Sequence, residues 1–420
     1  MTIKDYASIM NIKKLSGGNL MSNLLSEAKA LQNEIVTDRR YLHRHAELGM
    51  DLPMTSAYII KRLKGMGYKP EVVAGSGVVV LAGGKKPGKV LLLRADIDAL
   101  PIAEENDLKY KSETGNMHAC GHDTHAAMLL GAAKLLKDHE DEIEGTVKLM
   151  FQPAEERLYG AKAMIEAGVL ESPKVDAAAM IHIFSGMPMK AGTLVVAEGG
   201  YSSSSGDMFH IDIQGKGGHG AMPQDSIDPL NAAAHIFMGL QEIIAREVTP
   251  SSTAVITVGQ MHGGNAANII PDTSFIEGTI RAFDNREREL MKRRVVEISE
   301  RVASAYRAEA SVEYRMECPS VYNDSSLSEL CIYANREMLG TDNVLSFGEV
   351  FPDGRMTGSE DFGYISEKVP SIMMALGGGS PEEGYPYPQH HPKINFKEDI
   401  FYIGAAAYAN TAIQWLKNNN

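Results

Sequence analysis

"KVLLLRADID", residues 89–98, places four apolar residues in a row ahead of two aspartates. An apolar run without alternation is typical of a strand that is buried on both faces, as in a parallel sheet. The runs "GVVVLAG" (77–83), "TVKLMFQP" (146–153) and "AAAMIHIF" (177–184) are also short and β-rich, and the helical segment "AAMLLGAAKLLKDHE" (126–140) lies between two of them. The sequence therefore predicts an α/β domain with a mostly parallel sheet and helices on both faces.

The composition indicates a globular protein with a small substrate. The chain is 44% hydrophobic and 23% charged, as in globular proteins, and its 420 residues are enough for two or three domains. Its net charge of −13 would repel phosphate. We therefore expect a small-molecule substrate, with no nucleic acid and no membrane as partner.

Cysteine usage and the first residues predict a cytoplasmic protein. Cys120, Cys318 and Cys331 are odd in number and widely scattered, so they indicate no disulfide framework and favour a reducing compartment. Residues 1–20 resemble a short polar extension without the pattern of a secretory signal, and no run of about 18 apolar residues occurs in the sequence. We expect a soluble, cytoplasmic protein.

The sequence pattern changes near residue 200, where "GGYSSSSGD" (199–207) is typical of a flexible joint. The residues that follow predict a compact βαββαβ unit of ferredoxin-like type. Its predicted elements are strand 208–214, helix 227–247, strand 253–262, strand 273–283, helix 285–308 and strand 311–317. Elsewhere the predicted elements are helix 24–47, helix 325–339, the strand "SIMMALGGG" and a last helix from about 398. The predicted domains are a first catalytic segment (1–200), an inserted domain (201–318) and a second catalytic segment (319–420).

Reactive side chains follow three of the predicted strands. They are Asp96, Asp98, Glu155, Glu156 and His182. In open α/β sheets, ligands bind outside the carboxyl ends of the strands, so these groups are expected to converge on one crevice. A polar residue also ends a strand simply because the chain reaches solvent there. Five such residues at three successive strand ends favour a site.

The stretch "MHACGHDTHAAM" (117–128) favours a metal site at the start of a helix. Cys120 and His122 would point about 200° apart on an α-helix, so they need the non-helical turn that the glycine between them allows. Asp123 or Thr124 would then cap the helix. A thiolate and an imidazole are good ligands for first-row metals, although a lone cysteine is usually a small buried hydrophobe. No second cysteine is near enough for a redox role.

Other common motifs are missing from the sequence. "GKGGHG" (215–220) matches the dinucleotide-binding pattern, but "AMPQDSID" displaces the helix that should start at once, so no dinucleotide site is predicted. The chain contains no phosphate loop, no serine-nucleophile elbow and no helical H-E-x-x-H motif.

A series of motifs, taken in order, resembles one enzyme family. The motifs are "RADIDALP", "MHACGHDTH", "QPAEE", "IHIF", "GKGGHGAMPQDSIDP", "NIIPD" with "GTIRAF", "SEDF" and "HHP". The same series occurs in the amidohydrolase branch of the two-metal aminopeptidase and carboxypeptidase-like enzymes. That branch includes aminoacylases, hippurate hydrolases and indoleacetyl-amino-acid hydrolases. The resemblance spans residues 25–415 and implies a zinc-peptidase-like fold.

This resemblance implies a site for two divalent metal ions per subunit. The positions that match the family's ligands are Cys120, His122, Glu156, His182 and His390. Glu155 matches the general base, Asp98 matches an aspartate that supports the site, and Asp96 stands where other branches place a ligand histidine. His390 and His391 are both present in "QHHP", and the motif match picks the first. Manganese, zinc, cobalt and nickel all suit this mixed donor set.

The resemblance implies three further site residues in the inserted domain. His219 matches a histidine that reaches the active site of the partner subunit and helps to stabilise the oxyanion, while Asn268 and Arg281 match positions that hold the substrate's carboxylate. A turn histidine, a strand-end asparagine and a solvated arginine are the structural alternatives. The resemblance also implies a homodimer or homotetramer formed through this domain, which would serve for dimerisation or as a lid.

The implied activity is metal-dependent hydrolysis of the amide bond of an N-acyl amino acid with an acetyl, benzoyl or similar acyl group. Glu155 would take a proton from the attacking water and pass it to the leaving amine. The alternatives are a metallo-carboxypeptidase or dipeptidase and a binding protein without catalysis, although neither the base nor a ligand is missing. Ala46 replaces the proline that is usual in relatives, which bears on the substrate rather than on the reaction.

Overall fold

The structure, a computed structural model, describes residues 18–419, so residues 1–17 of the predicted extension lie outside the described residues. The described chain forms two compact units. The first comprises the chain up to Ser202, Tyr322–Arg355 and the chain from Tyr364 onward; the second comprises Ser203–Val321 and Met356–Gly363. Residues 319–420 were predicted to lie wholly in the catalytic part, whereas Met356–Gly363 belongs to the second unit.

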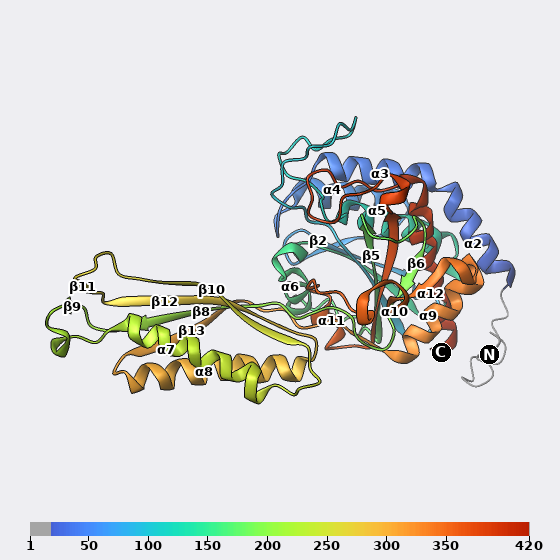
Figure 1. The fold of residues 1–420 in the computed structure, drawn as a ribbon. Helices are drawn as coiled ribbons and strands as arrows, with labels where there is room; N and C mark the ends of the chain where they lie inside the picture. Colours follow the sequence, from blue (N-terminus) through green and yellow to red (C-terminus); the bar gives the residue numbers. More distant parts are fainter. Residues whose placement is uncertain (1–17, 420) are drawn as a thin grey trace. The chain divides into compact units, whose positions relative to one another are not determined.

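An eight-stranded sheet forms the centre of the first unit within the described residues (Figure 1). Its strands, in spatial order, are β1 (Glu71–Val73), β2 (Gly77–Gly83), β4 (Thr146–Gln152), β3 (Val90–Asp96), β5 (Ala177–Ser185), β16 (Ser371–Gly379), β6 (Leu194–Val196) and β15 (Val344–Ser346). The four strands from β4 to β16 are parallel, and antiparallel pairs occur on both sides of them. Every residue of β3 and β16 is buried. The predicted α/β fold with a mostly parallel sheet is confirmed.

Helices of the first unit pack closely on this sheet and on one another. They are α2 (Gly18–Ala30), α3 (Gln32–Arg44), α4 (Pro53–Gly65), α5 (His122–Asp138), α6 (Gly160–Glu166), α9 (Ser325–Leu339), α10 (Phe347–Val350) and α12 (Phe401–Asn419), while α11 (Gly363–Ser366) begins on the last residue of the second unit. The single helix predicted over 24–47 is instead two helices that meet at Leu31. A Cβ on Gly131 of α5 would lie 2.9 Å from the Cβ of Ala405 in α12, so this approach requires glycine. Among residues 18–419, no helix has the length and apolar character needed to cross a membrane.

The second unit is the predicted βαββαβ arrangement. Its elements are β8 (Asp207–Gln214), α7 (Pro229–Glu242), β10 (Ala254–Gly263), β12 (Thr273–Ala282), α8 (Asn285–Ala305) and β13 (Glu309–Met316). The strands lie in the order β10-β12-β8-β13, with every neighbouring pair antiparallel. Phe209 and Ile211 of β8 pack in one core with Ile236 of α7 and Val295 of α8, so both helices cover the same face of the sheet. The predicted helix 227–247 ends its α-helical part at Glu242 and continues as a π-helical turn.

The four serines at 202–205 are not the flexible linker that the sequence predicted. All four are buried. The hydroxyl of Ser203 accepts a hydrogen bond from the N–H of Val321 at 3.0 Å, and the hydroxyl of Ser205 accepts one from the N–H of Ala282 at 3.0 Å. The prediction was wrong because serine is small enough to be buried and can satisfy backbone groups where several chain segments cross.

Candidate active site

The candidate site lies where the sheet of the first unit changes its winding direction. The chain passes from β3 through α5 to β4 on one side of β3, and then returns through α6 to β5 on the other side. A crevice forms outside the carboxyl ends of the strands at such a point. Asp96 ends β3, His182 lies in the carboxyl half of β5, and Glu155–Arg157 form a short 3-10 helix, η2, after β4.

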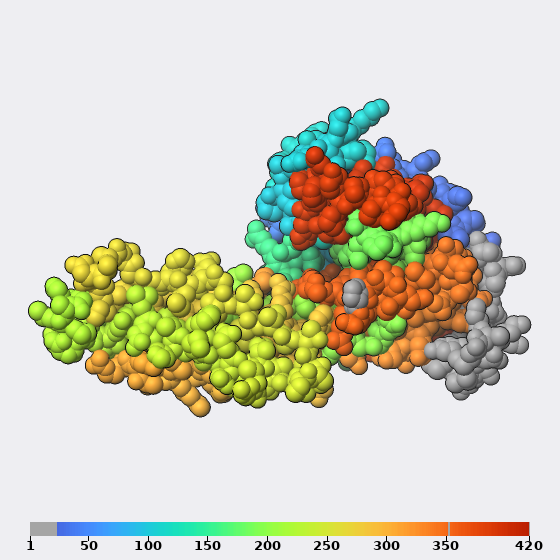
Figure 2. Space-filling model, in the orientation of Figure 1, coloured from blue at the N-terminus to red at the C-terminus, as the bar shows by residue number. Residues whose placement is uncertain are grey.

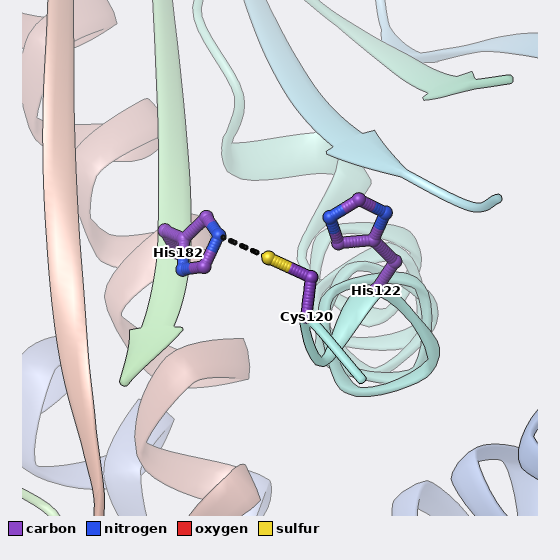
Figure 3. A group of neighbouring side chains, drawn as sticks. All are labelled: Cys120, His122 and His182. Carbon is purple, nitrogen blue, oxygen red and sulfur yellow. Dashed lines mark hydrogen bonds between the residues drawn. The ribbon is translucent and has the colours of Figure 1, made fainter. Parts of the chain in front are cut away.

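The turn before α5 brings Cys120 and His122 to this crevice. Gly121 between them is left-handed, with a φ of +89°, and a Cβ there would lie 2.5 Å from a methyl carbon of Ile183. This conformation and this space require glycine. Cys120 Sγ then lies 3.5 Å from His182 Nε2, with His122 beside it on the first turn of α5 (Figure 3).

The predicted cap of α5 is not observed. In the described chain no side chain caps this helix, whose N-cap residue is Gly121. Asp123 is fully buried; its Oδ1 accepts a hydrogen bond from the N–H of Thr124 at 2.9 Å, and its Oδ2 lies 2.8 Å from Arg39 Nε. The carboxylate balances a buried cation, because an unpaired buried charge is costly. Asp123 is therefore not the N-cap residue that the sequence predicted, although its carboxylate bonds one N–H of the first turn.

Two buried imidazoles, that of His122 at the turn and that of His182 in β5, present their Nε2 atoms to the crevice. His122 donates Nδ1–H to the backbone carbonyl of Asp98 at 2.9 Å, and His182 donates Nδ1–H to the carbonyl of Ile183 at 2.7 Å. Burial lowers the pKa of His182 and keeps it neutral. Burial also opposes the charged form of His122, but Asp96 and the hydrogen bond to Asp98 outweigh it and raise its pKa. The negative charge around His122 therefore favours a positive charge at this ring.

Asp98 fixes the backbone of the two adjacent glutamates. Its two carboxylate oxygens accept hydrogen bonds from the N–H groups of Glu155 at 3.0 Å and Glu156 at 3.2 Å. Glu155 Oε2 and Glu156 Oε1 lie 3.7 and 3.8 Å from His122 Nε2. Burial raises the pKa of Glu156 to about 7, with smaller contributions from the negative charges of Asp98 and Asp96 and against the lowering effect of His122.

His390, rather than His391, lies beside the glutamates. Its N–H donates to the carbonyl of Ala119 at 2.8 Å, its φ is +65°, and its Nε2 lies 3.6 Å from Glu156 Oε2. His391 instead stacks on the ring of Tyr387, with 4.3 Å between centroids. A left-handed non-glycine residue is uncommon, and here it aims His390 at the crevice.

The donor atoms at this crevice fit divalent metal ions. Three groups that consist only of the predicted ligands and the predicted base have donor atoms within 4.8 Å of one another, namely Cys120, His122 and His182; Cys120, Glu156 and His390; and His122, Glu155 and Glu156. His122 Nε2 and Glu156 Oε1 are buried and have no hydrogen-bond partner among the described residues. Buried polar atoms are normally satisfied, so a shared cation would explain two such atoms in one place. A thiolate, imidazoles and carboxylates together suit first-row divalent metals.

A buried ionic cluster behind the turn was not predicted from the sequence. His43 Nδ1 lies 2.8 Å from Asp123 Oδ2, and its Nε2 lies 3.2 Å from both oxygens of Glu104. Arg39 contacts the same Asp123 oxygen as His43. The spacing of Arg39 and His43 was the available signal, since residues i and i+4 share one face of a helix.

This cluster makes stability depend on pH through His43. Burial and Arg39 oppose the protonated ring, but Asp123 and Glu104 outweigh them and raise its pKa. A raised folded pKa gives stability that is full below the unfolded pKa of about 6.5 and is lost as pH rises through the folded pKa. His43→Gln should therefore lose more unfolding free energy at about pH 6 than at about pH 9 in urea titrations. A deficit that is constant or grows with pH would contradict this.

The predicted residues of the inserted domain lie in the second unit at two places. His219 and Asn268 line one open cavity of about 1130 Å³. This cavity lies beside the paired strands β9 (Gly218–His219) and β11 (Ile269–Ile270). The N–H of Gly220 donates to the carbonyl of Asn268 at 2.9 Å. The N–H of Ala221 donates to His219 Nδ1 at 3.1 Å, which leaves Nε2–H as a donor. Arg281 does not line that cavity and donates to the hydroxyl of Ser359.

Metal-dependent amide hydrolases are the class of protein to which this fold and this set of donors belong. Residues 92–414 match the model of peptidase family M20/M25/M40. The chain belongs to that family, so the predicted family and the predicted enzyme class are confirmed.

Named relatives and a solved structure cover nearly the whole chain. It is 39% identical over 406 residues to an IAA-amino acid hydrolase of Arabidopsis thaliana, covering 95% of this chain and 89% of the relative. It is 36% identical over 391 residues to N-acetyl-L-cysteine deacetylase of Bacillus subtilis, covering 93% and 90%. The solved structure of a dinuclear metal binding peptidase of the M20 family from Bacillus subtilis is 32% identical, with a TM-score of 0.76, and covers 93% of this chain and 99% of that one.

Proposed function

We propose that this enzyme hydrolyses the amide bond of N-acyl amino acids to a carboxylic acid and a free amino acid. The observation that carries the proposal concerns two buried atoms, His122 Nε2 and Glu156 Oε1. Neither has a hydrogen-bond partner among the described residues, and both face the same crevice as Cys120 and His182. The relatives named above as acting on an IAA-amino acid and on N-acetyl-L-cysteine support the substrate class. The proposed ligands of two divalent metals are Cys120, His122, Glu156, His182 and His390.

The protein's own groups would then move one proton and hold the reacting atoms. When bound, divalent metals supply Lewis acidity toward a water molecule and the amide carbonyl. Glu155 takes a proton from the attacking water and delivers it to the leaving amine, and Asp98 fixes the backbone that carries it. His219 would donate Nε2–H to the oxyanion that develops in the active site of the partner subunit. Asn268 and Arg281 hold the carboxylate of the amino acid.

A substrate panel tests the proposed function. The metal-loaded enzyme is offered N-acetyl, N-benzoyl and longer-chain N-acyl amino acids beside dipeptides with the same C-terminal residue. We expect higher kcat/KM values for the acylated amino acids, because the relatives that support this substrate class are named for an IAA-amino acid and for N-acetyl-L-cysteine. Faster dipeptide hydrolysis would favour the carboxypeptidase or dipeptidase alternative. No turnover of any acylated amino acid would contradict the proposed substrate class.

We also propose that two copies associate through the second unit. Strand β10 lies at the edge of the described sheet, and α7 exposes Phe237 and Met238, with Met238 64% exposed; Ile244 in the π-helical turn after α7 is also exposed. Figure 2 shows α7 in yellow-green on the visible face of this unit. An edge strand beside an exposed apolar helix is a self-complementary surface for a twofold dimer.

Met238→Arg should therefore convert a dimer to a monomer in sedimentation velocity, because an arginine buried at the interface would lack a partner. The thermal stability should not change. Met54→Arg is the matched control, since Met54 is an exposed methionine of the first unit. A dimer that survives Met238→Arg would contradict this interface.

For the compartment we propose the cytoplasm, supported by three free cysteines, Cys120, Cys318 and Cys331.

A further inference from the structure

Strands β3 and β5 pair only as far as Arg94, and two side chains occupy the gap between them beyond that point. The N–H of Ile181 donates to the hydroxyl of Tyr408 at 2.9 Å, and this hydroxyl donates to the carbonyl of Arg94 at 2.7 Å. Further along β5, the N–H of Ile183 donates to Nε2 of His125 at 2.8 Å. A side-chain acceptor thus replaces the backbone of β3 at each step.

Both ring nitrogens of His125 are used inside the protein. Its Nδ1–H donates to Asp96 Oδ1 at 2.5 Å, and its Nε2 accepts from Ile183. Arg94 holds the other oxygen of Asp96 at 2.7 Å, and all three side chains are buried. Asp96, His122 and His125 lie close enough together to share a metal ion, but His125 keeps no lone pair for one.

His125 lies between the two elements that carry the proposed ligands. Its ring centroid is 5.4 Å from that of His122, one turn earlier on α5, and 4.6 Å from that of His182. The residue that it holds, Ile183, directly follows His182 in β5. The hydrogen bond therefore connects the helix that carries His122 to the strand that carries His182.

We propose that His125 is a positioning residue that sets the spacing between His182 and the ligands at the start of α5 through its bond to Ile183. This inference rests on the proposed metal site. Neutral hydrogen bonds to the chain around a ligand fix the ligand's orientation, and their loss typically weakens metal binding by about 10–100-fold.

Two conservative variants separate this role from the alternatives. His125→Gln can place an acceptor near the position of Nε2 and reach Ile183, whereas His125→Asn is one methylene shorter and can only keep the contact with Asp96. The metal-free wild type and both variants are titrated with Co²⁺ against a chromophoric chelator, and the visible cobalt bands are recorded. We expect His125→Gln to bind Co²⁺ nearly as tightly as the wild type, and His125→Asn to bind about 10–100-fold more weakly with shifted bands.

Asn335→Ala is the control for general loss of stability. Asn335 is buried in the same unit and donates to the carbonyl of Cys331 and to Thr411, so its loss destabilises the fold without touching the site. Cobalt affinity should stay unchanged in this variant. Equal and tight binding by His125→Asn would overturn the inference, and equally weak binding by His125→Gln would point to the imidazole as a ligand. A wild type that binds no Co²⁺ would instead refute the proposed metal site.

Discussion

A Glu155→Gln enzyme is expected to keep its fold and its metal content while its kcat falls by about 10²–10⁴-fold, the usual contribution of a general acid–base group. The amide of glutamine fills the same space but cannot accept the proton of the attacking water. The loss should fall on kcat rather than on KM, because Glu155 acts on the reacting atoms and is not proposed to hold the substrate. Steady-state kinetics on an N-acyl amino acid, with elemental analysis of the same sample, measures both quantities.

The neighbouring residue supplies the matched control for this prediction. Glu156→Gln is the same chemical change one position later, but Glu156 is proposed as a metal ligand and its Oε2 lies 3.6 Å from His390. It should therefore lower the metal content as well as the rate. If Glu155→Gln lost metal to the same extent as Glu156→Gln, or kept most of its turnover, the division of roles would be wrong.

Removal of metal is expected to abolish hydrolysis and to lower the thermal stability of the first unit. A ligand that binds only the folded state stabilises it by about 4 kcal/mol when present at 1,000 times its Kd. Without it, the buried atoms His122 Nε2 and Glu156 Oε1 have no hydrogen-bond partner among the described residues. Dialysis against a chelator, followed by calorimetry and turnover measurements before and after addition of Zn²⁺, Mn²⁺ or Co²⁺, tests the prediction and ranks the metals.

Two buried free cysteines allow a control within the chain. Cys120→Ala removes a proposed ligand and should lower both the metal content and the stabilisation by added metal, whereas Cys331→Ala should leave both unchanged because Cys331 lies on α9 with no proposed ligand beside it. Turnover that persists in protein shown by elemental analysis to be free of metal would refute the proposed role.

The fold was predictable because its signals are local. The unbroken apolar runs identify strands β3 and β16, which are buried throughout, and the alternation after residue 207 identifies β8, in which one face packs on α7 and α8. The strand-end rule likewise anticipated that Asp96, the glutamate pair and His182 come together. These inferences needed only the period of the pattern and the direction of the chain.

What the sequence could not predict depends on partners far away along the chain. Asp123 resembles a helix cap in sequence, but its carboxylate pairs in a buried cluster with Arg39 and with His43, which is 80 positions earlier in the chain. The serines at 202–205 have the composition of a linker, yet backbone groups from other segments satisfy their hydroxyls. Composition carries no information about such long-range partners, so tertiary contacts decided both cases.

The return of residues Met356–Gly363 to the second unit has a consequence for the order of events during synthesis. The N–H of Ser204 donates to the carbonyl of Gly358 at 3.2 Å, and Arg281 bonds Ser359. Domains generally fold as the chain emerges, at about 5–20 residues per second. Residues 203–321 leave the ribosome well before this segment. The nascent second unit therefore lacks Met356–Gly363 for several seconds and can be completed only after that segment has been synthesised. A fragment that ends at residue 321 would lack the segment Met356–Gly363 altogether.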